Sequence, residues 1–181
     1  MDRMIIHTET ITDAAKKLRA GDTVLLSGTI YTARDAAHKK IFEKLDRGEP
    51  LPFELEHATI YYAGPTPAPE HLPIGSCGPT TSGRMDVFSP RLLDLGLKCM
   101  IGKGERSQAV MDAIVRNQAI YLCAIGGAGA LAAKCVRSVE VIAFEELGCE
   151  SVKRLEVENF PLIVAIDSLG NSLFERAVPA V

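Results

Sequence analysis

Residues 75–86 read Gly-Ser-Cys-Gly-Pro-Thr-Thr-Ser-Gly-Arg-Met-Asp, a run rich in glycine and hydroxyl residues. The glycines let a ligand approach the main chain closely. Thr80, Thr81 and Ser82 add three consecutive hydroxyl groups, and Arg84 adds a planar fork that fits a carboxylate or a phosphate. This run predicts an anion-binding loop, with an ordinary surface turn that ends in a helix cap as the equal alternative.

Length and composition limit the class of protein. The 181 residues are 47% hydrophobic and 24% charged, which predicts one globular domain, residues 1–181, with a sizeable core. The net charge of −3 gives no reason to expect nucleic acid or an anionic membrane as a partner. Because no apolar run is long enough to span a bilayer and the first residues do not resemble a signal peptide, we expect a cytoplasmic protein.

The cysteine pattern does not predict a metal site. The five cysteines are Cys77, Cys99, Cys123, Cys135 and Cys149. Their number is odd and no pair has the close spacing of a zinc or cluster knuckle, so we expect reduced thiols and no metal or cofactor ligands in this chain. Cys77 lies in the glycine-rich run, where a nucleophile or a metal ligand is conceivable, but loop cysteines more often have neither role.

Predicted strands and helices alternate along much of the chain. Apolar patterning predicts strands at residues 4–8, 23–30, 59–63, 98–101, 119–125, 139–144, 163–166 and 172–177. Helices are predicted to start near Thr10, Thr32, Asp86 and Ser107, three of which are hydroxyl residues that can cap a helix. Gly21, Gly48 and Gly96 are the predicted ends of the first three helices. This order predicts an α/β fold or a mixed three-layer architecture.

Three loops that adjoin apolar strands each supply one cation. Arg34 lies in the first turn of a predicted helix, where free N–H groups favour an anion, although a surface salt bridge is the simpler interpretation. Lys103 lies between two glycines at a strand's end, where an anion contact and a plain turn lysine are equally good interpretations. Together with Arg84, these cations predict a site for a small dicarboxylate. His38, one turn after Arg34, is either a second polar contact or a solvated helix residue.

A second glycine-rich run suggests an alternative function. Gly127, Gly129 and Ala132 match the dinucleotide-binding fingerprint in their letters, and Glu145 follows about 20 residues on. The intervening helix is short, however, and too little chain remains for a second mononucleotide-binding half. We keep a nucleotide-binding module, and a scaffold without catalytic chemistry, as alternatives to an enzyme.

Four separated segments together resemble a known family. Residues 27–38, 78–86, 102–107 and 126–131 read Ser-Gly-Thr-Ile-Tyr-Thr-Ala-Arg-Asp-Ala-Ala-His, Gly-Pro-Thr-Thr-Ser-Gly-Arg-Met-Asp, Gly-Lys-Gly-Glu-Arg-Ser and Gly-Gly-Ala-Gly-Ala-Leu. In this order they resemble the β subunit, or C-terminal domain, of class I fumarases, with the tartrate dehydratase β subunit as a near relative. The segments around Arg84 and Arg106 are more similar to the fumarase branch than to the tartrate dehydratase branch.

The resemblance implies a fold, an activity and a partner. The implied fold is a swivelling domain with three layers, β/β/α, and a mixed sheet. The implied activity is that of a hydro-lyase that reversibly hydrates fumarate to (S)-malate, with a tartrate dehydratase or a mesaconase-type hydratase as alternatives. The resemblance also implies a [4Fe-4S] cluster held by a separate α subunit and not by this chain, in an assembly of two α and two β chains.

The matching motifs also imply roles for individual residues. Arg34, Arg84 and Lys103 would bind the substrate carboxylates, and Thr80 would be the base that removes a proton from carbon. A threonine hydroxyl is a poor base near neutral pH, so this role requires a strongly cationic pocket that excludes water. Otherwise Thr80 hydrogen-bonds the substrate and another group moves the proton.

The secondary candidates are His38, Thr81, Ser82 and Asp86, among which the last two would orient Thr80 or Arg84. Under this resemblance the loop at residues 126–130 needs no nucleotide and is interpreted as a close backbone approach at the edge of the pocket.

Overall fold

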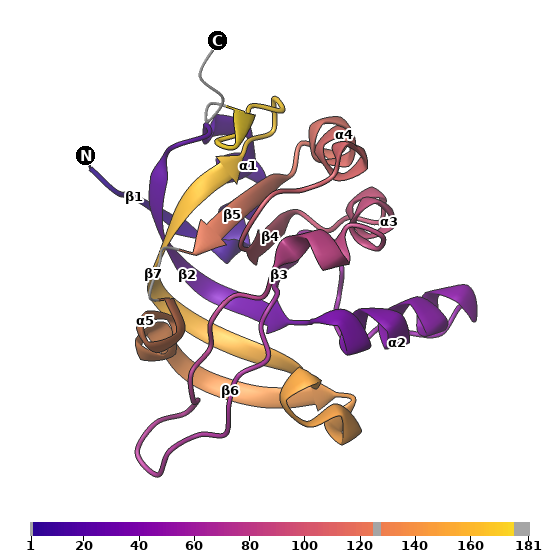
Figure 1. Cartoon of the computed structure of the whole chain (residues 1–181), viewed down its shortest axis with the longest axis vertical. Helices are drawn as coiled ribbons and strands as arrows, with labels where there is room; N and C mark the ends of the chain where they lie inside the picture. The colour runs from indigo at the N-terminus through magenta and orange to yellow at the C-terminus, as the bar shows by residue number, and fades with distance from the viewer. Residues whose placement is uncertain (1, 125–127, 176–181) are drawn as a thin grey trace.

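The computed structural model describes residues 2–124 and 128–175. Its strands form one mixed seven-stranded sheet in the order β1-β2-β3-β4-β5-β7-β6, with an additional pairing between β2 and β7 (Figure 1). The strands are β1 (Met4–His7), β2 (Thr23–Thr32), β3 (Thr59–Tyr61), β4 (Cys99–Gly102), β5 (Ile120–Ala124), β6 (Val136–Ala143) and β7 (Val152–Ile166). β1 to β5 run parallel, whereas β7 is antiparallel to β2, β5 and β6. The β2–β7 pairing closes the circuit β2-β3-β4-β5-β7.

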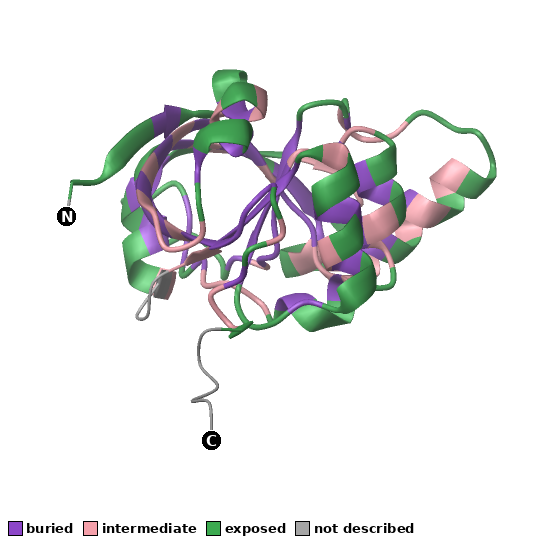
Figure 2. Cartoon of the chain, turned by 90° about the horizontal axis from the view of Figure 1, so that it is seen from above, coloured by how far each residue is buried: buried purple, intermediate pink, exposed green. Residues whose placement is uncertain are grey.

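The helices gather mainly on one side of this closed sheet. They are α1 (Ile11–Lys17), α2 (Asp35–Asp46), α3 (Ser89–Asp94), α4 (Gln108–Asn117) and α5 (Ala128–Cys135), with the short 3-10 segments η1 (Thr8–Thr10), η2 (Ser82–Met85) and η3 (Glu145–Glu150). α2, α3 and α4 lie together, with their exposed residues turned outward (Figure 2). Among these helices, none has the length and apolar character that crossing a membrane requires.

Alternate residues of the central strands face two separate cores. Ile101 and Leu122 belong to a core inside the closed sheet, which also contains Phe160 of β7. Met100 and Tyr121, their neighbours in the sequence, belong to a second core between the sheet and α2, α3 and α4. Because side chains alternate along a strand, the central strands are covered on both faces. The result is three layers, β/β/α, which confirms the predicted α/β fold with a mixed sheet.

Several predicted boundaries were wrong. β2 continues to Thr32, so α2 begins at Asp35 and Arg34 is its N-cap residue, without a side-chain cap bond. α1 ends at Lys17 rather than Gly21. Ser107 does cap α4, because its Oγ accepts a hydrogen bond from the Val110 N–H at 3.3 Å.

The second half of the chain departs further from prediction. β7 has 15 residues where four were expected. It contains a bulge opposite Ser27, where Asn159 takes a left-handed φ of 52° and donates its N–H to Ser27 Oγ at 3.0 Å. This bulge interrupts the alternation that a sequence pattern needs. The last strand predicted at 172–177 is reduced to a single bridge between Ile166 and Ser172 within the described residues, and 176–177 lie outside them.

The topology brings the predicted cations to one edge of the sheet. The carboxyl ends of the adjacent parallel strands β2, β3 and β4 lie side by side, and this edge is where ligands bind in many α/β proteins. Arg34 lies two residues beyond the end of β2, and Lys103 follows β4 directly.

His38 lies in the helix–sheet core and is not the solvated helix residue that one interpretation predicted. Its side chain is fully buried, and its ring stacks on Phe88 with the ring centroids 5.3 Å apart. Nδ1 lies 2.8 Å from the carbonyl oxygen of Arg34. Burial lowers the pKa of His38 from 6.5 to about 4, so the ring is neutral near pH 7.

We expect His38 to make the fold less stable as the pH falls. In the unfolded chain the ring takes up a proton below its ordinary pKa of 6.5, whereas in the folded chain it does so only near a pKa of about 4. The neutral ring of His38 therefore contributes fully to the free energy of unfolding above pH 6.5. This contribution is lost as the pH falls from 6.5 to about 4. Urea unfolding at about pH 7 and about pH 5 should show the wild type losing about 2 kcal/mol more than His38→Gln. Equal losses would contradict this assignment.

Candidate functional site

Arg34 and Arg84 line one cavity of about 410 Å³ at this edge of the sheet. Asp35, Lys39 and Glu150 also line it. Arg84 Nε lies 3.2 Å from Asp35 Oδ1, and Arg34 Nε lies 3.9 Å from Glu150 Oε1. The guanidinium groups of Arg34 and Arg84 come from segments far apart in the sequence and line the same cavity. The neighbouring carboxylates of Glu150 and Asp35 orient them.

The side chain of Arg34 lies across the backbone of Gly64. A Cβ atom on Gly64 would come within 3.0 Å of both Cδ and Nη1 of Arg34. Arg34 Nε is buried and has no hydrogen-bond acceptor among the described residues. Gly64 therefore leaves room for a guanidinium that the surrounding protein does not fully satisfy.

Backbone hydrogen bonds join the loop that carries Thr80 to the end of β4. The Thr80 N–H donates to the Tyr62 carbonyl oxygen at 2.6 Å, and Thr81 forms a parallel bridge with Lys103. Ser82 N–H donates to the Lys103 carbonyl oxygen at 2.9 Å, and Ser82 Oγ accepts from the Lys103 N–H at 3.1 Å. The structure thus places Thr80, Arg84 and Lys103 on two joined segments. The Thr80 hydroxyl has no hydrogen-bond partner within the described ranges.

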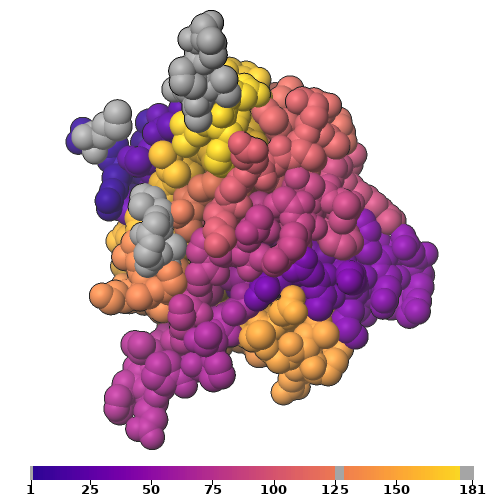
Figure 3. Space-filling model, viewed as in Figure 1, coloured from indigo at the N-terminus to yellow at the C-terminus, as the bar shows by residue number. Residues whose placement is uncertain are grey.

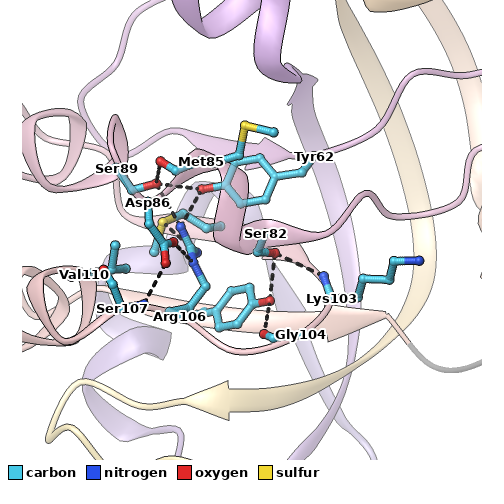
Figure 4. A network of polar contacts seen from close by, with 12 residues as sticks. Tyr62, Ser82, Met85, Asp86, Ser89, Lys103, Gly104, Arg106, Ser107 and Val110 are labelled. Carbon is cyan, nitrogen blue, oxygen red and sulfur yellow. Dashed lines mark hydrogen bonds and ion pairs between the residues drawn. The ribbon is translucent and has the colours of Figure 1, made fainter.

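Arg106, which sequence analysis did not single out, holds these two segments together (Figure 4). Its buried guanidinium donates to Asp86 Oδ1 at 2.7 Å, to Ser89 Oγ at 2.8 Å and to the Tyr62 hydroxyl at 3.2 Å. Asp86 Oδ2 accepts the Ser107 N–H at 2.6 Å. Asp86 thus orients Arg106, and the described contacts include none from Asp86 to Thr80 or Arg84.

Ser82 lies in the buried network behind the loop and does not line the cavity. It is fully buried, and its Oγ lies 2.7 Å from the Tyr121 hydroxyl, which also lies 2.8 Å from the Gly104 carbonyl oxygen. A Cβ on Gly102 would clash with Ser82 Oγ. In Figure 4 the amine of Lys103 points away from this network. The network therefore fixes the backbone at Lys103 and leaves its side chain exposed.

The second glycine-rich run packs against the first. Cys77 N–H donates to the Gly129 carbonyl oxygen at 3.1 Å, and a Cβ on Gly78 would lie 3.5 Å from Gly129 Cα. The two backbones thus approach closely at Gly129, but none of these three residues lines the cavity of Arg34 and Arg84, and residues 126 and 127 of the predicted loop lie outside the described residues. β5 and β6 are not neighbours in the sheet, so the parallel β-α-β unit that a dinucleotide fingerprint requires is missing there.

Two of the buried cysteines, Cys77 and Cys99, do not suit a nucleophile. In the part of the chain that the structure describes, no three Cys, His, Asp or Glu side chains are placed to hold a metal ion. Burial raises the pKa of the Cys77 and Cys99 thiols to about 12, so neither forms a thiolate near pH 7.

We expect Arg106→Met to lower the free energy of unfolding by about 3 kcal/mol, because it leaves the Asp86 carboxylate, whose side chain is only 13% exposed, without its charged partner. Arg116→Met is the matched control. Arg116 binds Asp94 with two hydrogen bonds of 2.8 and 2.9 Å, but at the surface, where such a pair contributes about 0–1 kcal/mol. Urea unfolding of both variants measures the difference, and similar losses would refute the structural role of Arg106.

Comparisons with known proteins agree with this arrangement. The family described as "Fumarase C-terminus" matches residues 1–177. The chain is 43% identical over 164 residues to "Fumarate hydratase 2" of Leishmania major, which covers 87% of this chain and 28% of that protein. It is 44% identical over 153 residues to "Fumarate hydratase class I, aerobic" of Escherichia coli K12, covering 83% and 28%.

A third relative has a similar length. The chain is 45% identical over 167 residues to "Putative L(+)-tartrate dehydratase subunit beta" of Methanocaldococcus jannaschii, covering 89% of this chain and 86% of that protein. The chain spans little more than a quarter of the fumarate hydratases it matches. Since the family match includes every segment that builds the cavity and its supporting network, this chain belongs to the fumarase C-terminus family.

Proposed function

We propose that the chain is the β subunit of a hydro-lyase that reversibly hydrates fumarate to (S)-malate together with a partner chain. The names of the fumarate hydratase relatives support this activity. The observation that carries it is the shared cavity of Arg34 and Arg84. Two planar forks that face one space suit a small dianion, because each fork can bind one carboxylate with two parallel hydrogen bonds.

We assign binding roles to the three cations of this edge. Arg34 and Arg84 bind the substrate carboxylates from two sides, and Lys103 adds a mobile ammonium from the adjoining segment. Thr81, Ser82, Asp86 and His38 have supporting roles in this proposal. They hold the loop and the start of α2 in place through the contacts described above.

We assign the proton transfer at carbon to Thr80. Thr80 is half-buried and lies in the same loop as Arg84, and its hydroxyl carries no protein hydrogen bond among the described residues. Nearby cations stabilise the alkoxide form and so lower the barrier to deprotonation of the hydroxyl. A threonine that only hydrogen-bonds the substrate is the alternative, and the two roles differ in the size of the kinetic effect.

We also propose that the partner chain holds the [4Fe-4S] cluster implied by the resemblance. Such a cluster needs several thiolates around one centre. The described residues of this chain offer no such group, and Cys77 and Cys99 are buried thiols. The fumarate hydratases extend far beyond the matched segment, and the relative of similar length is named a subunit beta. An assembly of two α and two β chains is the stoichiometry we propose.

A tartrate dehydratase is the second candidate. It is favoured by the relative that matches this chain over most of its length, which is named as a tartrate dehydratase subunit. Turnover of fumarate, L-malate and L-tartrate by the assembled enzyme distinguishes the two, and a preference for tartrate would replace the first proposal.

We expect activity only when the chain is combined with a partner chain. The purified chain should be colourless and inactive on fumarate and malate. Co-expression with the chain encoded beside it, followed by anaerobic reconstitution with iron and sulfide, should give hydration of fumarate and visible absorption by the cluster. Full activity of the isolated chain would overturn the two-chain proposal.

We expect Thr80→Val to lower kcat by several orders of magnitude in the assembled enzyme while the substrate still binds, because it keeps the shape and removes only the hydroxyl. Steady-state kinetics and substrate titration measure the two effects separately. A fall of only about tenfold, or about 1.4 kcal/mol, would assign Thr80 to binding and place the base elsewhere. Ser107→Ala, which removes a hydroxyl at a helix cap, controls for the loss of a hydroxyl as such.

A further inference from the structure

A buried lysine lies beneath the turn that faces Arg34. Lys153 is the second residue of β7, and only 9% of it is exposed. Its Nζ donates to Ser151 Oγ at 2.7 Å and lies 3.1, 3.2 and 3.4 Å from the carbonyl oxygens of Cys149, Ser151 and Gly148. All four acceptors are neutral and belong to one turn. This ammonium therefore gathers the oxygens of the turn at residues 148–151 around itself.

The same turn contacts Arg34 and the start of α2 through Glu150. Glu150 Oε1 lies 3.9 Å from Arg34 Nε and accepts the Ala36 N–H at 3.4 Å. The carbonyl oxygen of Cys149 lies 3.2 Å from the position of a Cβ on Gly64, beside the Arg34 side chain. In the space-filling view, η3 in orange lies directly against the start of α2 in purple (Figure 3). The side chain of Arg34 thus lies between Gly64 and the turn that Lys153 organises, with 29% of it exposed.

Lys153 is also tied to the strand that leads to Arg34. Its backbone N–H donates to Thr32 Oγ1 at 3.2 Å, and Thr32 is the last residue of β2. The same Oγ1 donates to the Ser151 carbonyl oxygen at 3.5 Å. The turn therefore has a fixed position relative to the end of β2 as well as to the side chain of Arg34.

We propose that Lys153 is a positioning residue for Arg34. Without the ammonium, Ser151 Oγ and the Cys149 carbonyl oxygen lose the donor that joins them, whereas the Gly148 and Ser151 carbonyl oxygens keep the Ser151 N–H and Thr32 Oγ1. The turn then rearranges, Glu150 moves away from Arg34, and the guanidinium loses its direction. The placement of Arg34 stands on geometry alone, whereas the kinetic consequence rests on the proposed function.

The first test observes Arg34 directly in the full chain. The Nε–Hε resonance of Arg34 is assigned in a ¹H–¹⁵N spectrum by its loss in Arg34→Lys. We expect Lys153→Met to shift or broaden this resonance. Lys98→Met is the matched control, because Lys98 is also a partly buried lysine that donates to a carbonyl oxygen, that of Asn117 at 2.7 Å, and should leave the resonance in place.

A milder variant guards against loss of the fold. Ser151→Ala removes only the shortest contact of the Lys153 ammonium and should shift the same resonance in the same direction by a smaller amount. An unchanged Arg34 resonance in a folded Lys153→Met or Ser151→Ala protein would overturn the proposal, as would an equal shift in Lys98→Met.

The second test uses the assembled enzyme. Lys153→Met should raise KM for the dianionic substrate by about tenfold with a smaller effect on kcat. In the Arg34→Ala background the same substitution should change kcat/KM by less than about twofold, because its target is already missing. Equal fold-losses in both backgrounds would show that Lys153 does not act through Arg34. If the assembly hydrates no substrate, the proposed function fails, while the Arg34 resonance still decides the role of Lys153.

Discussion

The buried pair of Arg106 and Asp86 is the interaction on which the candidate site depends. Each partner belongs to a different loop, and neither loop has regular structure long enough to place itself. Burial of a guanidinium is costly unless its donors are satisfied. Here the donors reach a carboxylate, two hydroxyls and a sulfur, and the plane lies over the rings of Tyr62 and Tyr121. Because desolvation of the charges offsets much of their attraction, the pair adds little net stability. Its main effect is to fix how the two loops meet.

The sheet supplies the frame in which this pair can form. The central strands are covered by side chains on both faces, so their ends emerge from a rigid layer at a common edge. Each loop at that edge leaves from a strand end that its neighbours already hold. Glycines at the tight approaches leave room for the side chains of this edge, as Gly64 does for Arg34 and Gly102 does for Ser82.

Sequence patterns predicted the strands of this frame and three of its charged residues, because apolar runs and loop cations are local signals. Arg34, Arg84 and Lys103 were expected to converge; Arg34 and Arg84 line one cavity, whereas Lys103 is not among its lining residues. Arg106 was missed because polar residues flank it and its burial comes from Tyr62 and Tyr121, which are distant in the sequence. The length of β7 was missed because the bulge at Asn159 and the charged residues on its outer face break the alternation. Lys153 gave no signal, since a lysine in a strand usually faces solvent.

Closure of the sheet also limits how copies of this chain can associate through their strand edges. An unpaired strand edge is a template for association with another chain, and native folds keep such edges short or charged. Among the described strands, the circuit leaves free edges at β1 and β6. β1 has only four residues, and β6 carries Arg137 and Glu140, each in an ion pair with β7. The long strands β2 and β7, which would be the most prone to aggregate if they were open, have both edges covered over much of their length. The pairing that builds the frame is therefore also its protection against edge-to-edge aggregation.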